Sequence, residues 1–302
     1  MKMPEGQQAM DQYLAKLEEE LLLRTNPPDL KDHPVWQAAA YSIRAGGKRI
    51  RPELLFRTLL LLGQEPDETA TAFAAALEMV HTYSLIHDDL PAMDDDDFRR
   101  GQPACHIRFG EARAILAGDL LLNLAYETML EMGKENTGAP GAMQALAYAA
   151  GGRGMILGQD RDLQMEKKKP EEISLSDVYG MAEKKTGCLI EAAFLMAGHL
   201  AGAPDEVIRE LSVLGLSAGL VFQIRDDILD QEASLDTLGK TPDKDARSGK
   251  KTFVTVGGLE GARRALDTEA GKIQEALWNL SKLGYDISGL KDYLDRLAER
   301  TF

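Results

Sequence analysis

Six aspartates within ten residues are the feature of this sequence that most directly indicates chemistry. They lie in the stretch HTYSLIHDDLPAMDDDDFRRG, from His81 to Gly101, and are Asp88, Asp89, Asp94, Asp95, Asp96 and Asp97. Phe73, Leu77 and Val80 precede them at helical spacing. The pattern therefore predicts that an apolar helix ends in the first carboxylates.

Carboxylates are unfavourable at this position unless a cation is bound. A helix C-terminus disfavours an anion by about 0.3–1 kcal/mol. Two carboxylates about 4 Å apart repel by on the order of 4 kcal/mol at an effective dielectric constant of ~20. Mg²⁺ suits such a site because it prefers oxygen ligands and is usually shared between one or two carboxylates and substrate phosphates. The cluster predicts a magnesium site, with a solvated acidic loop as the alternative.

A second acidic cluster favours the magnesium interpretation. The segment FQIRDDILD places Asp226, Asp227 and Asp230 on another apolar helix, and Asp226 and Asp230 are four residues apart on one helical face. Two aspartate-rich helix ends could face each other across one cavity. The pair of clusters is a stronger signal than either cluster alone.

Basic residues occur in short blocks near these clusters. Lys48, Arg49 and Arg51 follow two glycines and precede Pro52 at an expected helix start, which is a suitable place to bind an anion, although a surface turn is the alternative. The other basic positions are Arg99, Arg100, Lys184, Lys185, Lys240, Lys250 and Lys251. This arrangement fits a diphosphate ligand, whose oxygens would be shared between metal ions and cationic side chains.

The composition restricts the class of protein. The 302 residues include 35 Lys and Arg against 49 Asp and Glu, a net charge of −14, which argues against general nucleic-acid binding and against an anionic membrane surface. Cys105 and Cys188 form no metal-ligand spacing and no disulfide framework. With no signal-peptide core and no apolar run near the ~20 residues that span a bilayer, we expect a cytoplasmic protein without stable membrane insertion.

Helical periodicity dominates the chain and predicts a single all-α domain over residues 1–302. Pro27, Pro91 and Pro170 mark expected interruptions. Helices are expected at 8–24, 34–44, 52–63, 67–90, 111–133, 141–165, 174–200 and 204–231, with two more after a polar loop at 231–251. His81 lies two helical turns before Asp88 on nearly the same face, and His87 is expected to orient a carboxylate rather than to bind metal.

Seven segments in order resemble the trans-polyprenyl diphosphate synthases, and within that family the bacterial farnesyl diphosphate synthases. The segments are GGKRIRP, the first aspartate stretch, GQDRDLQ, EKKTG, FQIRDDILD, TLGK and GKKTF. They cover nearly the whole chain. The resemblance implies a large helical bundle around a central cavity, of the isoprenoid synthase type, and a homodimer. It also implies Mg²⁺-dependent condensation of isopentenyl diphosphate with dimethylallyl or geranyl diphosphate through an allylic carbocation.

The resemblance also implies roles for individual residues. Three Mg²⁺ ions would be held by Asp88, Asp94 and Asp226, supported by Asp89, Asp227 and Asp230. The allylic diphosphate would be bound by Arg99, Lys185 and Lys240, and the diphosphate of isopentenyl diphosphate by Lys48, Arg51, His81 and Arg100. Thr186 and Gln223 would stabilise the carbocation. Lys250 would bind substrate within a closing loop at 239–251 that excludes water.

Product length is expected to depend on Tyr83 and Ser84, which lie five and four residues before Asp88. Five residues of helix correspond to roughly 7.5 Å. The resemblance, in which bulky residues occupy this position, implies that the tyrosine ring closes the pocket after a fifteen-carbon chain. The alternative is that Tyr83 packs in the core and its hydroxyl finds a partner. Geranylgeranyl diphosphate synthase, another short-chain prenyltransferase and a terpene cyclase are alternative enzymes. The non-enzyme alternative is a non-catalytic subunit of a heterodimeric prenyltransferase, which typically loses one or both aspartate motifs.

Overall fold

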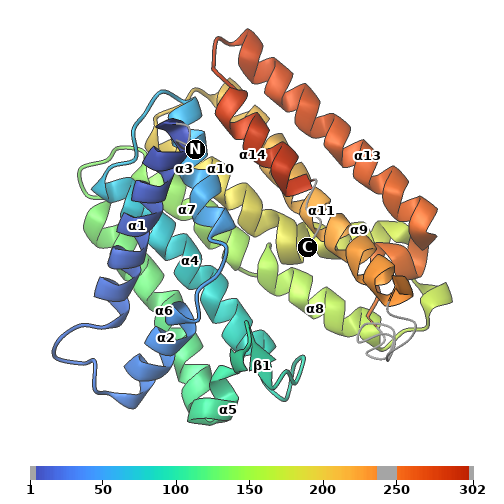
Figure 1. The fold of residues 1–302 in the computed structure, drawn as a ribbon, viewed down its shortest axis with the longest axis horizontal. Helices are drawn as coiled ribbons and strands as arrows, with labels where there is room; N and C mark the ends of the chain where they lie inside the picture. Colours follow the sequence, from blue (N-terminus) through green and yellow to red (C-terminus); the bar gives the residue numbers. More distant parts are fainter. Residues whose placement is uncertain (1–4, 237–249, 299–302) are drawn as a thin grey trace. The chain divides into compact units, whose positions relative to one another are not determined.

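The computed structural model describes residues 5–236 and 250–298, and most of these residues are helical (Figure 1). The predicted all-α class is confirmed. The only strands in the described part of the chain are β1 (Phe98–Arg99) and β2 (Gln102–Pro103), which pair antiparallel. The helices are α1 (Glu5–Thr25), α2 (Pro34–Arg44), α3 (Ile50–Leu61), α4 (Glu68–Asp88), α5 (Cys105–Phe109), α6 (Glu111–Met132), α7 (Ala139–Ala150), α8 (Met155–Glu166), η1 (Pro170–Glu172), α9 (Leu175–Ala182), η2 (Glu183–Gly187), α10 (Cys188–Leu200), α11 (Asp205–Asp236), α13 (Phe253–Lys282) and α14 (Ser288–Ala298).

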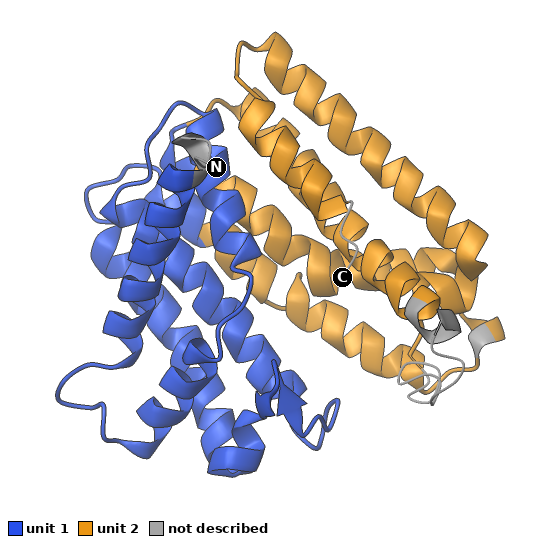
Figure 2. Ribbon diagram, in the orientation of Figure 1, with its two compact units in different colours: residues 1–143, 199–202 blue, residues 144–198, 203–302 orange. Residues whose placement is uncertain are grey.

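The chain divides into two compact units (Figure 2). Unit 1 comprises residues 1–143 and 199–202, and unit 2 comprises residues 144–198 and 203–302. The single domain over residues 1–302 stays a prediction. Each unit has its own packed helices and contains one of the two aspartate motifs, at the end of α4 in unit 1 and on α11 in unit 2.

Helix α4 is the core of unit 1. Its N-terminus is capped by Asp67, whose carboxylate accepts a hydrogen bond of 2.7 Å from the Ala70 amide. Every residue from Ala70 to Val80 is buried, as expected for a helix that packs against α1, α3 and α6. A helix buried on all sides is held firmly, and the acidic residues at its C-terminus are therefore fixed in place.

The contact between α4 and α6 corrects one prediction. His87 bonds through Nε2 to the Ile115 carbonyl at 3.0 Å, and its ring occupies the space beside Gly118. A Cβ on Gly118 would lie 2.1 Å from His87 Nε2, so this packing depends on glycine. His87 therefore joins two helices, and the expectation that it orients a carboxylate is wrong. Its position next to Asp88 in the sequence suggested a contact that the direction of its side chain does not make.

In unit 2 a π-helical turn, η2, lies between α8 and α11. A Cβ on Gly158 of α8 would lie 2.1 Å from the backbone nitrogen of Lys185, and one on Gly219 of α11 would lie 2.7 Å from the Cα of Gly187. Backbones approach this closely only where side chains are absent. The two glycines therefore bring Lys185 and Thr186 next to both helices.

Several predicted boundaries change. The expected helix at 141–165 is two helices, α7 and α8, because Gly151, Gly152 and Gly154 interrupt it. The expected helix at 174–200 consists of α9, the π turn and α10. Helix α3 begins at Ile50, two residues before Pro52. The remaining expected helices are confirmed to within a few residues, apart from α11, which continues to Asp236.

One described helical segment, Asp205–Glu232, is long and apolar enough to cross a membrane by length and composition. The sequence analysis expected no such run. Half of its most apolar window is buried within the protein, as is common for a core helix of this length. The same helix packs along α13, which accounts for its apolar residues.

Candidate active site

The first aspartate motif forms a loop that folds back over the end of α4. Asp88 is the last residue of the helix, and its carbonyl accepts a hydrogen bond of 2.8 Å from the Asp94 amide. The Asp96 amide donates to the Asp89 carbonyl at 3.2 Å, and Asp95 adopts a left-handed conformation with φ 51°. These bonds bring the backbones of Asp88 and Asp94 together. The two predicted metal ligands of this motif are thus neighbours despite six residues of separation.

Asp89 has a different environment from Asp88. It is 2 % exposed, and Arg99 donates to its Oδ1 from Nε at 2.9 Å and from a second guanidinium nitrogen. Burial raises the pKa of the Asp89 carboxyl, and the Arg99 guanidinium opposes that rise. Asp89 therefore holds Arg99, a role that the sequence analysis did not assign to it.

The β1–β2 hairpin presents two arginines side by side. Its two-residue loop consists of Arg100 and Gly101, with φ of 52° and 75°, as a type I′ turn requires. Arg99 ends β1 and points to Asp89. The guanidinium of Arg100 lies over Gly47, where a Cβ would be 2.8 Å from Arg100 Cζ. The hairpin thus connects the first aspartate motif with the glycine turn of GGKRIRP.

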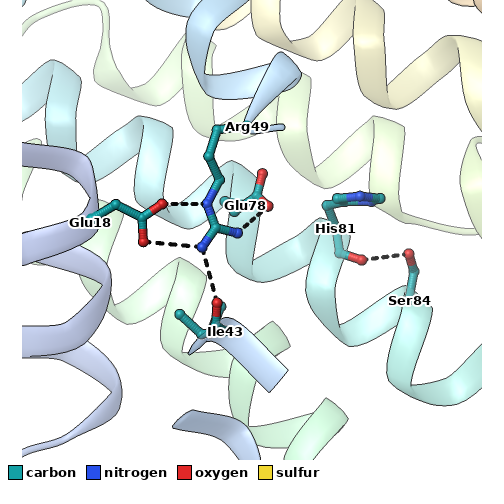
Figure 3. A network of polar contacts seen from close by, with 6 residues as sticks. All are labelled: Glu18, Ile43, Arg49, Glu78, His81 and Ser84. Carbon is teal, nitrogen blue, oxygen red and sulfur yellow. Dashed lines mark hydrogen bonds and ion pairs between the residues drawn. The ribbon is translucent and has the colours of Figure 1, made fainter. Parts of the chain in front are cut away.

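Arg49 is the structural member of the GGKRIRP block (Figure 3). It is 6 % exposed and caps α3 in a left-handed conformation with φ 49°. Its guanidinium donates to Glu18 at 2.6 and 3.1 Å, to Glu78 at 2.7 Å and to the Ile43 carbonyl at 3.0 Å. Because Arg49 is anchored to three elements, the backbone at Lys48 and Arg51 on either side of it is fixed.

The surroundings of His81 contain more positive charge than the nearby carboxylates offset. Arg51 Nε is buried and has no hydrogen-bond partner among the described residues. Burial lowers the pKa of Arg51 to about 10, while the charge of Glu78 acts in the opposite direction. Burial is the main cause that holds the pKa of His81 well below its ordinary value, and the charges of Arg51 and Arg100 lower it further. His81 is therefore neutral and surrounded by arginines, and a bound anion would stabilise the positive charge of those arginines.

The second motif connects three elements of unit 2. Asp227 is buried, with Oδ1 accepting from Gln223 Nε2 at 2.9 Å and Oδ2 accepting from the Phe253 amide at 2.8 Å. Gln223 Oε1 accepts from the Thr186 hydroxyl at 2.9 Å. Burial raises the pKa of Asp227 to about 7, against the effect of these hydrogen bonds. The chain Thr186–Gln223–Asp227 thus runs from the π turn through α11 to the start of α13.

Lys185 has a partner that the sequence analysis missed. Asp162 on α8 is 7 % exposed and accepts from Lys185 Nζ at 2.5 Å. The segment GQDRDLQ was noted as a motif, but nothing in its pattern distinguishes the buried Asp162 from the exposed Asp160. The structure thus brings together Lys185, Thr186, Gln223 and Asp227 within unit 2.

Lys240 and Lys250 belong to the connection between α11 and α13, only part of which the structure describes. Lys240 lies outside the described residues. Lys250 is described and half-buried, and it precedes the capping box that Thr252 and Thr255 form at the start of α13. Phe253, the first residue of that helix, is fully buried and contacts Tyr179 edge-on at 4.9 Å.

Comparison with known proteins gives the family. A sequence profile described as polyprenyl synthetase matches residues 33–279. The chain belongs to the polyprenyl synthetase family. It is 40 % identical over 282 residues to farnesyl diphosphate synthase of Micrococcus luteus, covering 93 % of this chain and 94 % of that protein. It is 39 % identical to the chloroplastic geranylgeranyl pyrophosphate synthase 9 of Arabidopsis thaliana, covering 88 % and 73 %.

A crystal structure of an FPP/GFPP synthase from Zymomonas mobilis is similar, with a TM-score of 0.79, 31 % identity and 97 % of both chains covered. The predicted resemblance, the isoprenoid synthase type of fold and the prenyltransferase class are confirmed. The names of these relatives specify products of different chain lengths, so family membership leaves the product length of this chain open.

The carboxylates of this polyprenyl synthetase fit a cation shared with a phosphate ligand. Among residues 5–236 and 250–298, no three His, Cys, Asp or Glu groups converge closely enough to hold a metal by themselves. Mg²⁺ usually keeps several waters and binds one or two carboxylates plus substrate phosphates, for which the adjacent Asp88 and Asp94 are suited. Asp89 and Asp227 already accept two hydrogen bonds each and fit a supporting role.

Tyr83 lies in the interior, close to the first motif. It is 6 % exposed, and its ring contacts that of His87 at 5.8 Å between centroids. Its hydroxyl is buried without a hydrogen-bond partner among the described residues, and burial raises its pKa to about 12. The core alternative expected a partner for this hydroxyl. Ser84 instead donates to the His81 carbonyl at 2.8 Å within the same helix (Figure 3).

The environment of Arg49 predicts unequal roles for its two carboxylates. Glu78→Gln should lower the free energy of unfolding by ~1–3 kcal/mol. Glu78 is only 2 % exposed, so water cannot replace its carboxylate as the partner of Arg49. The matched change Glu18→Gln should cost at most ~1 kcal/mol, because the Glu18 side chain is 45 % exposed. Urea unfolding of both variants measures the difference. Equal losses would contradict the assigned role of Glu78.

Proposed function

We propose that this polyprenyl synthetase is a farnesyl diphosphate synthase. It would join isopentenyl diphosphate head to tail (1'-4) to dimethylallyl and then geranyl diphosphate, releasing diphosphate. The observation that carries the proposal is the near full-length similarity to a farnesyl diphosphate synthase, with both aspartate motifs retained. Retention of both motifs also argues against a non-catalytic subunit. The GGKRIRP block, which serves a second diphosphate, argues against a terpene cyclase.

Metal ions would be bound by Asp88, Asp94 and Asp226, with Asp89, Asp227 and Asp230 in support. Bound Mg²⁺, proposed as three ions, would draw electron density into the allylic diphosphate so that its C–O bond breaks. Arg99, Lys185 and Lys240 would hold that leaving group. The ion pair with Asp162 supports this role for Lys185, because it fixes the ammonium on the π turn.

The carbocation would be stabilised by neutral oxygen atoms. Thr186 and Gln223 are joined by a hydrogen bond, and Asp227 fixes the Gln223 amide. Preorganised dipoles of this kind stabilise developing charge without reacting with it. The double bond of isopentenyl diphosphate attacks the cation, and the departed diphosphate takes the proton, so no side-chain base is required.

The isopentenyl diphosphate subsite would consist of Lys48, Arg51, His81 and Arg100. The unbonded Nε of Arg51 and the low pKa of His81 support it, because both reflect cationic surroundings that an anion would relieve. Lys250 would contribute from the segment that precedes α13. A closing segment at 239–251, most of which lies outside the described residues, would keep water from the cation.

Product length, assembly and location complete the proposal. A buried tyrosine below Asp88 favours a fifteen-carbon product over the twenty-carbon product of a geranylgeranyl diphosphate synthase. A cytoplasmic homodimer is proposed. Ile115, Leu116 and Leu130 of α6 are 44 %, 55 % and 62 % exposed, which supports contact with a second copy.

The function is tested by supplying dimethylallyl and isopentenyl diphosphates with Mg²⁺ and identifying the dephosphorylated products by chromatography. We expect farnesol as the main product and no turnover in excess chelator, since ionisation depends on the metal. Full activity in chelator would contradict the metal requirement. A main product of twenty carbons would contradict the assigned length while leaving the prenyltransferase class intact.

The two subsites should respond differently to substitution. Lys48→Ala should raise the KM for isopentenyl diphosphate roughly 10- to 100-fold, as expected for one lost charge-assisted hydrogen bond of about 1.5–3 kcal/mol. Asp88→Ala or Asp226→Ala should mainly lower kcat. Steady-state kinetics with each substrate varied in turn measures both effects. If Lys48→Ala changed only the allylic KM, the subsites would be reversed.

Tyr83 should limit chain length through its ring. Tyr83→Ala should lengthen the main product to geranylgeranyl diphosphate or beyond. Tyr83→Phe is the matched control, because it keeps the ring and removes a hydroxyl that has no described partner. Its product should remain at fifteen carbons. An unchanged product distribution in Tyr83→Ala would remove this residue from the role.

A further inference from the structure

A concave surface of unit 1, apart from the residues assigned above, has the character of an anion site. It is a polar cleft of about 810 Å³, including its open mouth, formed by residues from the α1–α2 connection, α2, β2 and α5. Three cations line it, Lys31, Arg44 and Arg108, with the amides of Asn26, Gln37 and Gln102. None of the residues assigned above to metal or substrate lines this cleft.

The charge of the cleft is opposite to that of the chain. The protein carries −14, yet no carboxylate is among the residues that line the cleft. Within residues 5–236 and 250–298, none of the three cations makes an ion pair. Cationic side chains gathered in a cleft of an acidic protein create a local positive potential that attracts anions.

Arg108 is held in position before any ligand binds. Its Cζ lies 4.5 Å from the centroid of the Tyr41 ring and 5.7 Å from that of Phe109. The Tyr41 ring contacts Phe109 edge-on at 5.4 Å, and its hydroxyl donates to the Pro103 carbonyl at 2.8 Å. A guanidinium restrained by aromatic rings loses less conformational freedom when it binds phosphate.

We propose that this cleft binds the diphosphate group of a small anion, at a site separate from the proposed active site. Three cations match the charge of a diphosphate, arginine binds phosphate oxygens in pairs, and the amides supply neutral donors. The apolar part of the lining is limited to Ala40 and the rings of Tyr41 and Phe109, so recognition is of the diphosphate and not of a prenyl chain. Inorganic diphosphate, isopentenyl diphosphate and a nucleoside diphosphate share this group.

The test is equilibrium dialysis of labelled inorganic diphosphate in excess chelator, which removes metal-dependent binding at the aspartate motifs. The starting protein is the full chain with Lys48→Gln and Arg51→Gln, which weakens the proposed isopentenyl diphosphate subsite. Only the change in diphosphate affinity caused by further substitutions in the cleft is assigned to the cleft. Adding Arg44→Gln and Arg108→Gln should weaken that binding at least tenfold. The matched control adds Arg153→Gln and Arg209→Gln, two exposed arginines of unit 2, removes the same charge and should leave binding unchanged.

Binding that survives the cleft substitutions, or that falls equally in the control, would overturn the proposal. If the combined variant does not fold, as judged by its melting temperature, Lys31→Gln alone is tested against Arg153→Gln alone, which removes the same charge. Unlabelled isopentenyl diphosphate and ADP are then used as competitors. Displacement by both at similar concentrations supports recognition of the diphosphate group, and preference for one identifies the source of the ligand. Displacement by neither would contradict that recognition.

Discussion

Charged side chains at the ends of buried apolar helices are the constraint on which this structure depends. Helix α4 is buried from Ala70 to Val80, yet it carries the carboxylates of Glu78, Asp88 and, at its cap, Asp89. Each buried charge needs a partner, since an isolated ion in a protein interior costs several kcal/mol. Glu78 is paired with Arg49 and Asp89 with Arg99. The arginine-bearing segments are therefore tied to α4 by the helix's own carboxylates.

The two units satisfy this constraint in different ways. In unit 1, Arg49 and Arg99 are each paired with buried carboxylates, whereas Arg51 Nε remains buried without a described partner. In unit 2, the buried Asp227 is satisfied by neutral donors, an amide side chain and a backbone amide, and its pKa rises to about 7. An anion would complete the first arrangement, and a nearby cation would favour the ionised form in the second.

The sequence predicted the helical class and the motif residues because their signals are local. Periodicity gives helices, and the aspartate and basic blocks are contiguous in the chain. What it did not predict depends on contacts between distant segments. Asp162 and Asp160 are equivalent in the sequence, and only the position of α8 beside the π turn makes Asp162 the partner of Lys185. His87 was assigned by its neighbour Asp88, whereas its ring is turned to Gly118 on α6.

Several of these contacts depend on glycines, and such contacts cannot be predicted from the chemistry of the side chains. The predicted roles of Lys185 and Thr186 require the π turn to lie against α8 and α11, and that approach depends on Gly158 and Gly219, neither of which bears a functional group. Gly47 likewise leaves room for the guanidinium of Arg100. A side chain at any of these positions would move a cation that the proposed chemistry uses. The positions of the basic residues are thus set as much by absent side chains as by the carboxylates that bind them.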